Sequence, residues 1–224
     1  MSDAIGGGRA AAFLALWNGI DPGRDDEYNQ WHALEHVPQR LTVPGMLRGR
    51  RYVARDDLTY PYFTLYDLAS SEVLASAEYE ALLTDPTEWS RSMRPSFREM
   101  LRIPCRDVAV RAFGSGGALM TLELNDVGAI DPAAWQSAVV ELAGLQGVIA
   151  ARAGIEVMEL AGLPWREGDS APARRAVRGV VLQQGQEPAL LHGQHPSVMR
   201  CLAMCGPPAQ MTVRHYTLMS LHDC

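Results

Sequence analysis

Short apolar runs punctuate the first half of the chain, and each is bounded by residues that favour turns. The first run, residues 12–20, is rich in bulky side chains and stops at Asp21-Pro22-Gly23, as a buried strand does before a turn. Two further runs follow Pro44-Gly45 and are joined by a polar link, which is the pattern of a hairpin. The predicted strands of this half cover residues 12–20, 46–55, 62–69 and 106–113.

Two stretches between these strands have helical spacing. The first begins with a cluster of acidic residues, which suits the positive end of a helix, and its apolar positions then recur every three or four residues. We expect this helix to span residues 24–41 with a bend at Pro38, since proline removes a backbone donor. A second helical region is predicted for residues 70–101, with breaks at Pro86 and Pro95.

The resulting order is strand, helix, strand, strand, helix, strand. This is the split βαβ or ferredoxin-like plan, in which both helices lie on one face of a four-stranded sheet. The same order begins again after the glycine-rich joint at 114–117, with Leu145-Gln146-Gly147 in the place of Val43-Pro44-Gly45 and Arg152 in the place of Arg50. In the second half we expect strands at 118–124, 147–160, 178–183 and 211–221, a helix at 131–142, an exposed loop at 164–175, and room for only a short helix within 186–208.

These patterns predict an α+β fold made of two tandem ferredoxin-like halves, residues 1–114 and 115–224. One face of each predicted sheet lacks a helical cover. Because two weakly similar halves in one chain are what a fused homodimer would give, we expect the sheets to pack face to face as an intramolecular pseudo-dimeric barrel. The protein is therefore expected to be a monomer of this kind or a homodimer.

Composition narrows the function by exclusion. The net charge is −6, which argues against a non-specific grip on nucleic acid, and the apolar run at 10–17 is too short for a signal peptide core or a membrane span, so we expect a cytoplasmic protein. All 20 cationic residues are arginines, which excludes mechanisms that need a lysine amine. The four cysteines lack paired C-x-x-C spacing, so we expect neither a zinc site nor a redox site.

The densest chemistry lies on the first predicted helix. Helical spacing stacks Trp31 on Glu35 and His32 on His36, which makes two adjacent columns. His36 is the leading candidate for proton transfer, because imidazole titrates near neutral pH and needs no metal. Glu35 is a weaker partner for it, because it points about a quarter-turn away.

A structural interpretation of this helix stays open beside the chemical one. In it, Trp31 and His36 only pack against the sheet while Glu35 pairs with Arg50 or Arg51. The spacing of His32 and His36 suits two metal ligands, but the order differs from H-E-x-x-H and no third ligand is apparent, so we expect no metal and no cofactor.

Trp31, Glu35, His36 and Pro38, followed by the Pro44-Gly45 turn and an arginine-bearing strand, form a pattern that resembles the EthD-like members of the dimeric α+β barrel superfamily. The resemblance covers the first half well and the second only as a fold. It implies a small-molecule pocket, because this superfamily includes cofactor-free monooxygenases, lactone isomerases, polyketide cyclases and decarboxylases. Many members have no assigned activity.

Arginines and aromatic residues supply the remaining candidates. Alternation sends Arg50 and Arg51 to opposite faces of their strand, and either could stabilise an anion, although a solvated face with salt bridges is the commoner arrangement. The predicted substrate-binding residues are large or aromatic side chains near the first helix, and the same residues could simply fill the core: Trp17, Tyr28, Trp31, His32, Tyr52 and Tyr66.

The second half lacks the chemistry of the first. At the repeat offset, Ala133, Ser137 and Ala138 stand where Trp31, Glu35 and His36 do, so we expect the active pocket in the first half. The leading hypothesis is a cofactor-independent isomerase, cyclase, dehydratase or decarboxylase acting on an aromatic, lactone or polyketide-like substrate, with His36 as general acid or base and Arg50 or Arg51 stabilising an anion. The alternatives are a cofactor-free monooxygenase and a non-catalytic ligand-binding or stress-associated barrel protein.

Overall fold

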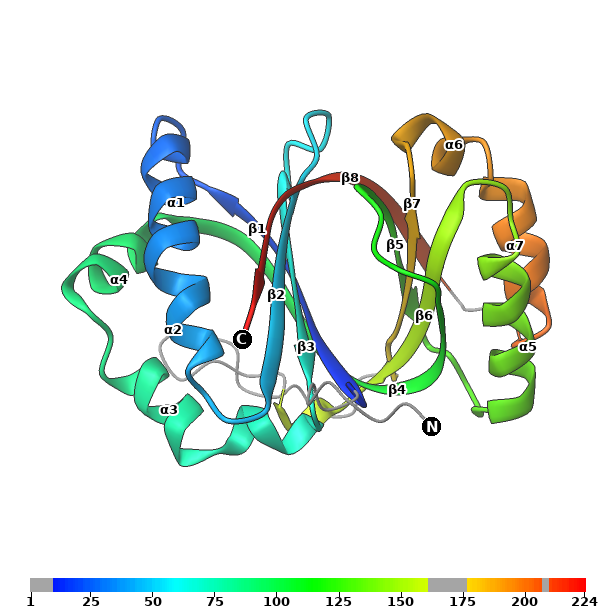
Figure 1. Ribbon diagram of the computed structural model, residues 1–224, viewed down its shortest axis with the longest axis horizontal. Helices are drawn as coiled ribbons and strands as arrows, with labels where there is room; N and C mark the ends of the chain where they lie inside the picture. Colours follow the sequence, from blue (N-terminus) through cyan, green and yellow to red (C-terminus); the bar gives the residue numbers. More distant parts are fainter. Residues whose placement is uncertain (1–9, 161–176, 207–209) are drawn as a thin grey trace, which may run out of the picture.

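The computed structural model describes residues 10–160, 177–206 and 210–224, and it divides them into two series of elements with the same order (Figure 1). The first series is β1 (Ala12–Ile20), α1 (Asp25–Trp31), α2 (Val37–Leu41), β2 (Met46–Val53), β3 (Tyr62–Leu68), α3 (Ala77–Thr84), α4 (Glu88–Met93) and β4 (Phe97–Ala112). The second series is β5 (Ala118–Asn125), α5 (Pro132–Ala143), β6 (Val148–Glu156), β7 (Gly179–Gly185), α6 (Pro188–His192), α7 (His195–Ala203) and β8 (Gln210–Asp223).

The eight strands form one closed barrel in the order β1-β3-β2-β8-β5-β7-β6-β4. Within this ring each half keeps the strand order of a ferredoxin-like sheet, so the expected fold is confirmed. The last strand of each half is long, and it pairs with its own sheet and then with the other one: β4 joins β1 to β6, and β8 joins β5 to β2. The barrel is therefore closed by covalently connected halves, and β4 and β8 each pair on one side alone over much of their length.

The two halves match residue by residue around the predicted turns. Gly45 and Gly147 both adopt the left-handed conformation, with φ of 89° and 76°, and each precedes the strand that carries the equivalent arginine. Arg50 lies opposite Leu65 of β3, and Arg152 lies opposite Leu182 of β7. The repeat offset predicted from the sequence thus coincides with equal positions in the two sheets.

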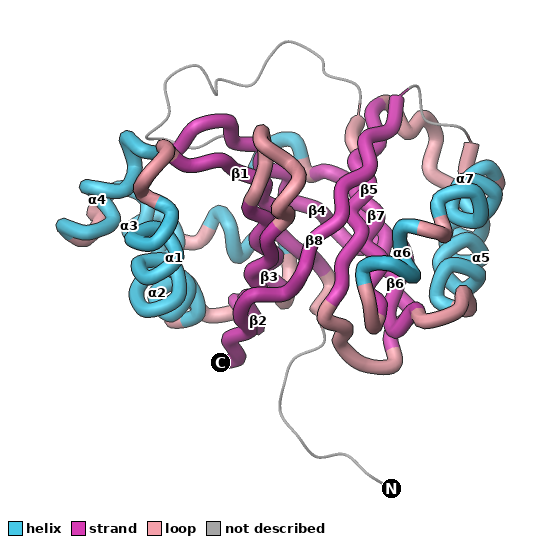
Figure 2. Tube along the Cα trace, turned by 90° about the horizontal axis from the view of Figure 1, so that it is seen from above, coloured by secondary structure: helices cyan, strands magenta, loops and turns pink. Residues whose placement is uncertain are grey.

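Hydrophobic side chains from both halves fill the barrel interior. The core there is formed by Phe13, Ala15, Trp17, Tyr52, Phe63, Leu65, Ile103, Leu119, Val180, Leu182 and Tyr216, all 5% exposed or less. The Trp17 indole donates a hydrogen bond across the interior to Thr121 Oγ1 at 3.3 Å. Helices pack on the outer faces, with α1 to α4 against the first sheet and α5 to α7 against the second (Figures 1 and 2).

The boundaries differ from expectation mainly at β4. The predicted helical region 70–101 contains a 3₁₀ turn (Ser71–Ala75), α3 and α4, and the chain is already extended from Phe97, nine residues before the strand expected at 106. Two helices, α6 and α7, occupy the part of the second half where only a short one was expected. The predicted loop at 164–175 lies outside the described residues. No helix in the described part of the chain is long and apolar enough to cross a bilayer.

Candidate functional site

The first helix changes its winding at the residues that carry the motif. Between α1 and α2, residues His32–His36 form one π-helical turn, in which the N–H of Val37 donates to the carbonyl of His32. Such turns insert an extra residue into a helix and are frequent at functional sites. Here the turn stacks the His36 ring against Trp31 and His32, with ring centroids 4.4 and 4.7 Å away.

A cavity of about 50 Å³ lies between this turn and the outer face of the first sheet. Its polar lining comprises His32, His36, Arg40, Thr64, Ser90, Arg94 and Arg102. Its apolar lining includes Leu14, Leu16, Tyr66, Tyr79, Phe97 and Met100. The cavity therefore combines two imidazoles and three guanidinium groups with a mainly apolar wall, and no carboxylate belongs to this lining.

Both histidines of the cavity favour the neutral form. Burial lowers the pKa of His36 well below its usual value, and the positive charges of Arg40, Arg51 and Arg94 lower it further. Burial likewise lowers the pKa of His32, and the positive charge of Arg51 lowers it further. His32 Nε2 lies 3.5 Å from Thr64 Oγ1, while its Nδ1 is buried with no hydrogen-bond partner among the described residues. Neutral His36 can accept a proton from a molecule in the cavity.

The arginines create a positive field at the same place. Arg40 and Arg102 are only 7% and 6% exposed, and neither has a carboxylate within ion-pair distance in the described part of the chain. Arg40 stacks over the Tyr79 ring at 5.5 Å, and Arg102 donates to Tyr79 Oη at 3.4 Å. Burial alone would raise the pKa of Tyr79, but Arg102 and Arg40 together outweigh it and lower this pKa. The field therefore stabilises negative charge in the cavity.

Glu35 holds the cover of the cavity in place. Its Oε1 accepts hydrogen bonds from Trp31 Nε1 at 3.1 Å, Thr87 Oγ1 at 2.6 Å and Ser90 Oγ at 3.0 Å. Thr87 caps α4 and Ser90 lies within it, so one carboxylate oxygen ties the first helix to α4. The expected pairing of Glu35 with Arg50 or Arg51 does not occur in the structure.

The two neighbouring arginines of β2 have separate surroundings. Arg51 is 2% exposed on the helix side, where it donates to Asn29 Oδ1 at 3.0 Å and stacks over Tyr28 and Tyr62 at 5.0 and 5.7 Å. Arg50 points into the barrel and pairs with Asp67 at 2.6 Å. The sheet thus separates Arg50 from His36.

The predicted binding residues divide in the same way. Three of them, Trp31, His32 and Tyr66, line the cavity together with His36. The Tyr28 and His32 rings lie edge to face, with their centroids 5.4 Å apart. Trp17 and Tyr52 belong instead to the core of the barrel interior. Among the described residues, no group of three metal-ligating side chains gathers around His32 and His36.

The sequence interpretation missed the residues that give the cavity its charge. Arg40 follows His36 by four positions on the same helix, so the helical spacing contained a signal for it. Tyr79, Arg94 and Arg102 are 43 to 66 residues further along than His36, and no local pattern places them beside it. They approach only through packing of α3, α4 and β4 on the first helix.

Comparison with known proteins supports the fold. The sequence matches no protein-family model and no curated relative. Among solved structures, an anthrone oxidase-like protein superposes with a TM-score of 0.61 at 10% identity, over 96% of this chain and 95% of that one. A proposed monooxygenase from Lactobacillus acidophilus NCFM superposes with a TM-score of 0.59 at 8% identity, over 96% of this chain and 97% of that one. A mutant chlorite dismutase from Candidatus Nitrospira defluvii superposes with a TM-score of 0.53 at 10% identity, over 95% of this chain and 93% of that one. At these identities the likeness shows a shared fold.

Proposed function

We propose that this protein is a cofactor-independent enzyme that binds a small organic anion in the cavity beside His36 and uses His36 as a general base. The observation that carries the proposal is the position of neutral His36 next to Arg40 and Arg102, two buried guanidinium groups with no carboxylate partner among the described residues. A buried cation is normally paired, so an anionic ligand is the natural complement of this lining.

The first chemical step in this proposal is removal of a proton from carbon beside a carbonyl group. The imidazole of His36 takes the proton, the electron pair moves to the carbonyl oxygen, and the guanidinium groups of Arg40 and Arg102 stabilise the enolate. Return of the proton to another atom gives an isomerase, attack of the enolate on a second carbonyl carbon gives a cyclase, and expulsion of a β-hydroxyl, which takes the proton from His36 and leaves as water, gives a dehydratase. In a decarboxylase the same enolate forms when the bond to the carboxylate breaks and carbon dioxide leaves, and a proton is then added to the carbon. Arg51 takes part through its field, whereas Arg50 lies across the sheet and has no part in this step.

The size of the cavity limits the substrate. An aromatic ring needs about 150 Å³, three times the space now enclosed, so an aromatic, lactone or polyketide-like substrate requires the cover formed by α3 and α4 to move outward. Glu35 is the main polar link between this cover and the first helix. We propose that loosening of this link admits the substrate.

A cofactor-free monooxygenase is the second candidate. It shares the first step, because a substrate carbanion can react with dioxygen directly. Two structural neighbours are described as a monooxygenase and an anthrone oxidase-like protein. Oxygen consumption during turnover separates this candidate from the isomerase and lyase types.

We also propose that the chain is an EthD-like barrel protein whose halves, residues 1–114 and 115–224, arose by tandem duplication. The motif on the first helix and the matching positions of Gly45 and Gly147 support this origin. Such a chain completes its barrel as a monomer and needs no second copy to do so.

A thermal-shift screen of small carboxylates, aromatic acids, lactones and enolisable ketones tests the function. Binding raises the melting temperature of the native protein by mass action, and His36→Ala or Arg40→Met should remove this rise for the active ligand class. His195→Ala, at an exposed histidine of the second half, is the matched control and should keep it. Exchange of the ligand's carbon-bound hydrogen for deuterium in the native protein alone would demonstrate the base. Equal responses of all four proteins would refute the proposed site, and binding without exchange or turnover would leave a ligand-binding protein.

A further inference from the structure

A second and larger cavity opens at the end of the barrel where β3 and β7 terminate. Its volume is about 560 Å³, and it lies on the opposite side of the first sheet from His36. Its charged and polar lining comprises Arg48, Arg50, Asp67, Asp107, Ser115, Gln136, Arg152 and Gln184. Alanines at 10, 11, 109, 112, 150 and 151 form much of the remaining wall. None of the chemistry proposed above uses this cavity.

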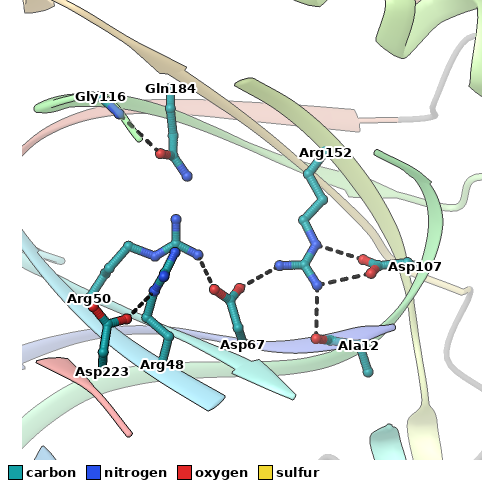
Figure 3. A network of polar contacts seen from close by, with 9 residues as sticks. All are labelled: Ala12, Arg48, Arg50, Asp67, Asp107, Gly116, Arg152, Gln184 and Asp223. Atoms are coloured by element: carbon teal, nitrogen blue, oxygen red, sulfur yellow. Dashed lines mark hydrogen bonds and ion pairs between the residues drawn. The ribbon is translucent and has the colours of Figure 1, made fainter. Parts of the chain in front are cut away.

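An ion network runs along its floor (Figure 3). Asp67 accepts from Arg50 and from Arg152, each at 2.6 Å, through different carboxylate oxygens. Arg152 is also held by Asp107 at 2.6 and 2.9 Å, and by the carbonyl of Ala12 at 2.8 Å. Arg152 therefore has two carboxylate partners, whereas Arg50 has one.

The difference between the two arginines follows from the pseudo-symmetry of the barrel. Asp67 lies opposite Arg48 in the β2–β3 pair, and Gln184 lies opposite Ala150 in the β6–β7 pair. Arg48 and Ala150 each precede the equivalent arginines, Arg50 and Arg152, by two residues. Their partners Asp67 and Gln184 therefore occupy equivalent positions in the two sheets. A carboxylate in the first half is thus replaced by an amide in the second.

The orientation of this amide is fixed. Gln184 Oε1 accepts from the backbone N–H of Gly116 at 3.3 Å, so its NH₂ group is the end turned toward Arg50 (Figure 3). Only glycine fits at position 116, because a Cβ there would lie 2.2 Å from the carbonyl oxygen of Gly185. The absence of a side chain therefore lets the N–H of Gly116 reach Gln184. Figure 3 shows the Arg50 guanidinium and the Gln184 amide pointing toward one another.

Two donors cannot satisfy each other. Among the described residues no acceptor bonds to Gln184 Nε2, an atom that is not fully buried, and Arg50, which is 5% exposed, has one fully buried nitrogen without a partner, its Nε. An unsatisfied buried donor is costly, and one on a cation more so. The described residues supply no acceptor between the two groups, so an anion that enters the cavity can bond to both of them.

We propose that the end of the barrel binds the carboxylate of a small organic acid, with one carboxylate oxygen between Arg50 and Gln184. The charge of Arg50 and the amide donor hold the anion, and the alanine wall accommodates a short apolar body. Phosphate offers the same oxygen chemistry but no apolar part, so a carboxylate fits this cavity better. This site is independent of the cavity beside His36.

The melting temperature at pH 7 in sodium propionate, sodium phosphate and sodium chloride of equal ionic strength tests the proposal. Propionate at about ten times its Kd should raise the melting temperature of the native protein by roughly 3–6 °C above the chloride value. Gln184→Glu supplies the missing carboxylate internally, so it should melt higher than the native protein in chloride and should no longer respond to propionate. Gln30→Glu adds the same charge at an exposed position on α1, in the lining of neither cavity, and should respond as the native protein does.

His36→Ala separates this site from the proposed active site, because it should keep the full propionate response. If Gln184→Glu does not fold, titration calorimetry of propionate into Gln184→Leu takes its place, with an expected loss of affinity of at least about tenfold. A native response no larger than that in chloride, a Gln184→Glu protein that responds normally, or an unchanged Kd in Gln184→Leu would overturn the proposal. A stronger response to phosphate than to propionate would overturn the choice of an organic acid.

Discussion

The carboxylate of Glu35 offers a direct test of how the cavity cover is held. One oxygen of this side chain receives hydrogen bonds from Trp31 on the first helix and from Thr87 and Ser90 at α4. Glu35→Ala removes the acceptor that these donors on the two elements share. Glu35→Gln keeps an acceptor oxygen at the same place but removes its charge.

The size of the effect follows from these contacts. Each hydrogen bond to a charged group contributes about 1.5–3 kcal/mol, but three donors share one oxygen of a half-buried side chain, so their contributions do not add in full. Trp31 Nε1 also donates to Ser90 Oγ at 3.3 Å, and this bond can survive the substitution. We therefore expect Glu35→Ala to lower the free energy of unfolding by about 2–4 kcal/mol, and Glu35→Gln by about 1 kcal/mol.

Urea denaturation and calorimetry measure these losses. For a chain of this length they correspond to roughly 4–16 °C in melting temperature for the alanine variant and roughly 2–4 °C for the glutamine variant. Glu27→Ala is the matched control, because Glu27 is a glutamate on the same helix whose pair with Arg24 at 2.6 Å is 43% exposed on the Glu27 side. If Glu35→Ala costs no more stability than Glu27→Ala, Glu35 does not hold the cover.

Three further outcomes are expected. Burial lowers the pKa of His32, so the unfolded chain binds this proton first as the pH falls. Below pH 6.5, His32 should therefore lower the free energy of unfolding by about 1.4 kcal/mol per pH unit, in addition to the share of His36. Urea titrations of the native protein and His32→Gln should differ by this slope. Gly49→Ala should cost about 1–3 kcal/mol by calorimetry, because its Cβ would lie 2.6 Å from Cγ1 of Val37. Arg152→Met should cost about 3 kcal/mol in the same assay, because it removes the largely buried cation that bridges Asp67 and Asp107, whereas Arg48→Met at a more exposed pair should cost less than about 1 kcal/mol.

Much of the fold could be predicted because local signals and tertiary packing agree. β1 is bounded by turn residues, the Pro44-Gly45 turn places a glycine where φ is positive, and α5 begins with Asp131 capping its first turn. The repeat was visible for the same reason, since Gly45 and Gly147 meet one conformational demand at both places. In these elements the conformation that the local sequence favours is the conformation that tertiary packing requires.

β4 shows where local reasoning failed. Its first nine residues carry charges and Pro104, which argue against a central strand. The structure accommodates them because this part of β4 pairs with β1 alone and meets β6 only from Cys105 onward. Proline is tolerated there since one edge of the strand has no strand partner. Such an edge is a property of the assembled barrel, and no window of sequence contains it.

Only the part of the candidate site that lies on the first helix could be predicted from the sequence. His32, His36, Trp31 and Glu35 lie within five residues, so their stacking followed from helical spacing, although the π-helical turn did not. Arg102 reaches the cavity from β4 and Arg94 from the segment before it, and both depended on the strand boundary that was misjudged. The anion-stabilising arginine was therefore predicted on β2, whereas the arginines that line the cavity with His36 lie on other elements.

The alternation of β2 explains how one strand can serve two separate sites. Arg51 faces the helices, where its charge acts on both cavity histidines, and Arg50 faces the barrel, where it is fixed by Asp67. A shift of one residue in the pairing of β2 would exchange these two environments. It would bury Arg50 beside the histidines without Asn29 and leave Asp67 without its first partner. The pairing of Arg50 with Leu65 and Leu221 on its two sides therefore specifies both cavities at once, and their chemistry rests on the closure of the barrel by β8.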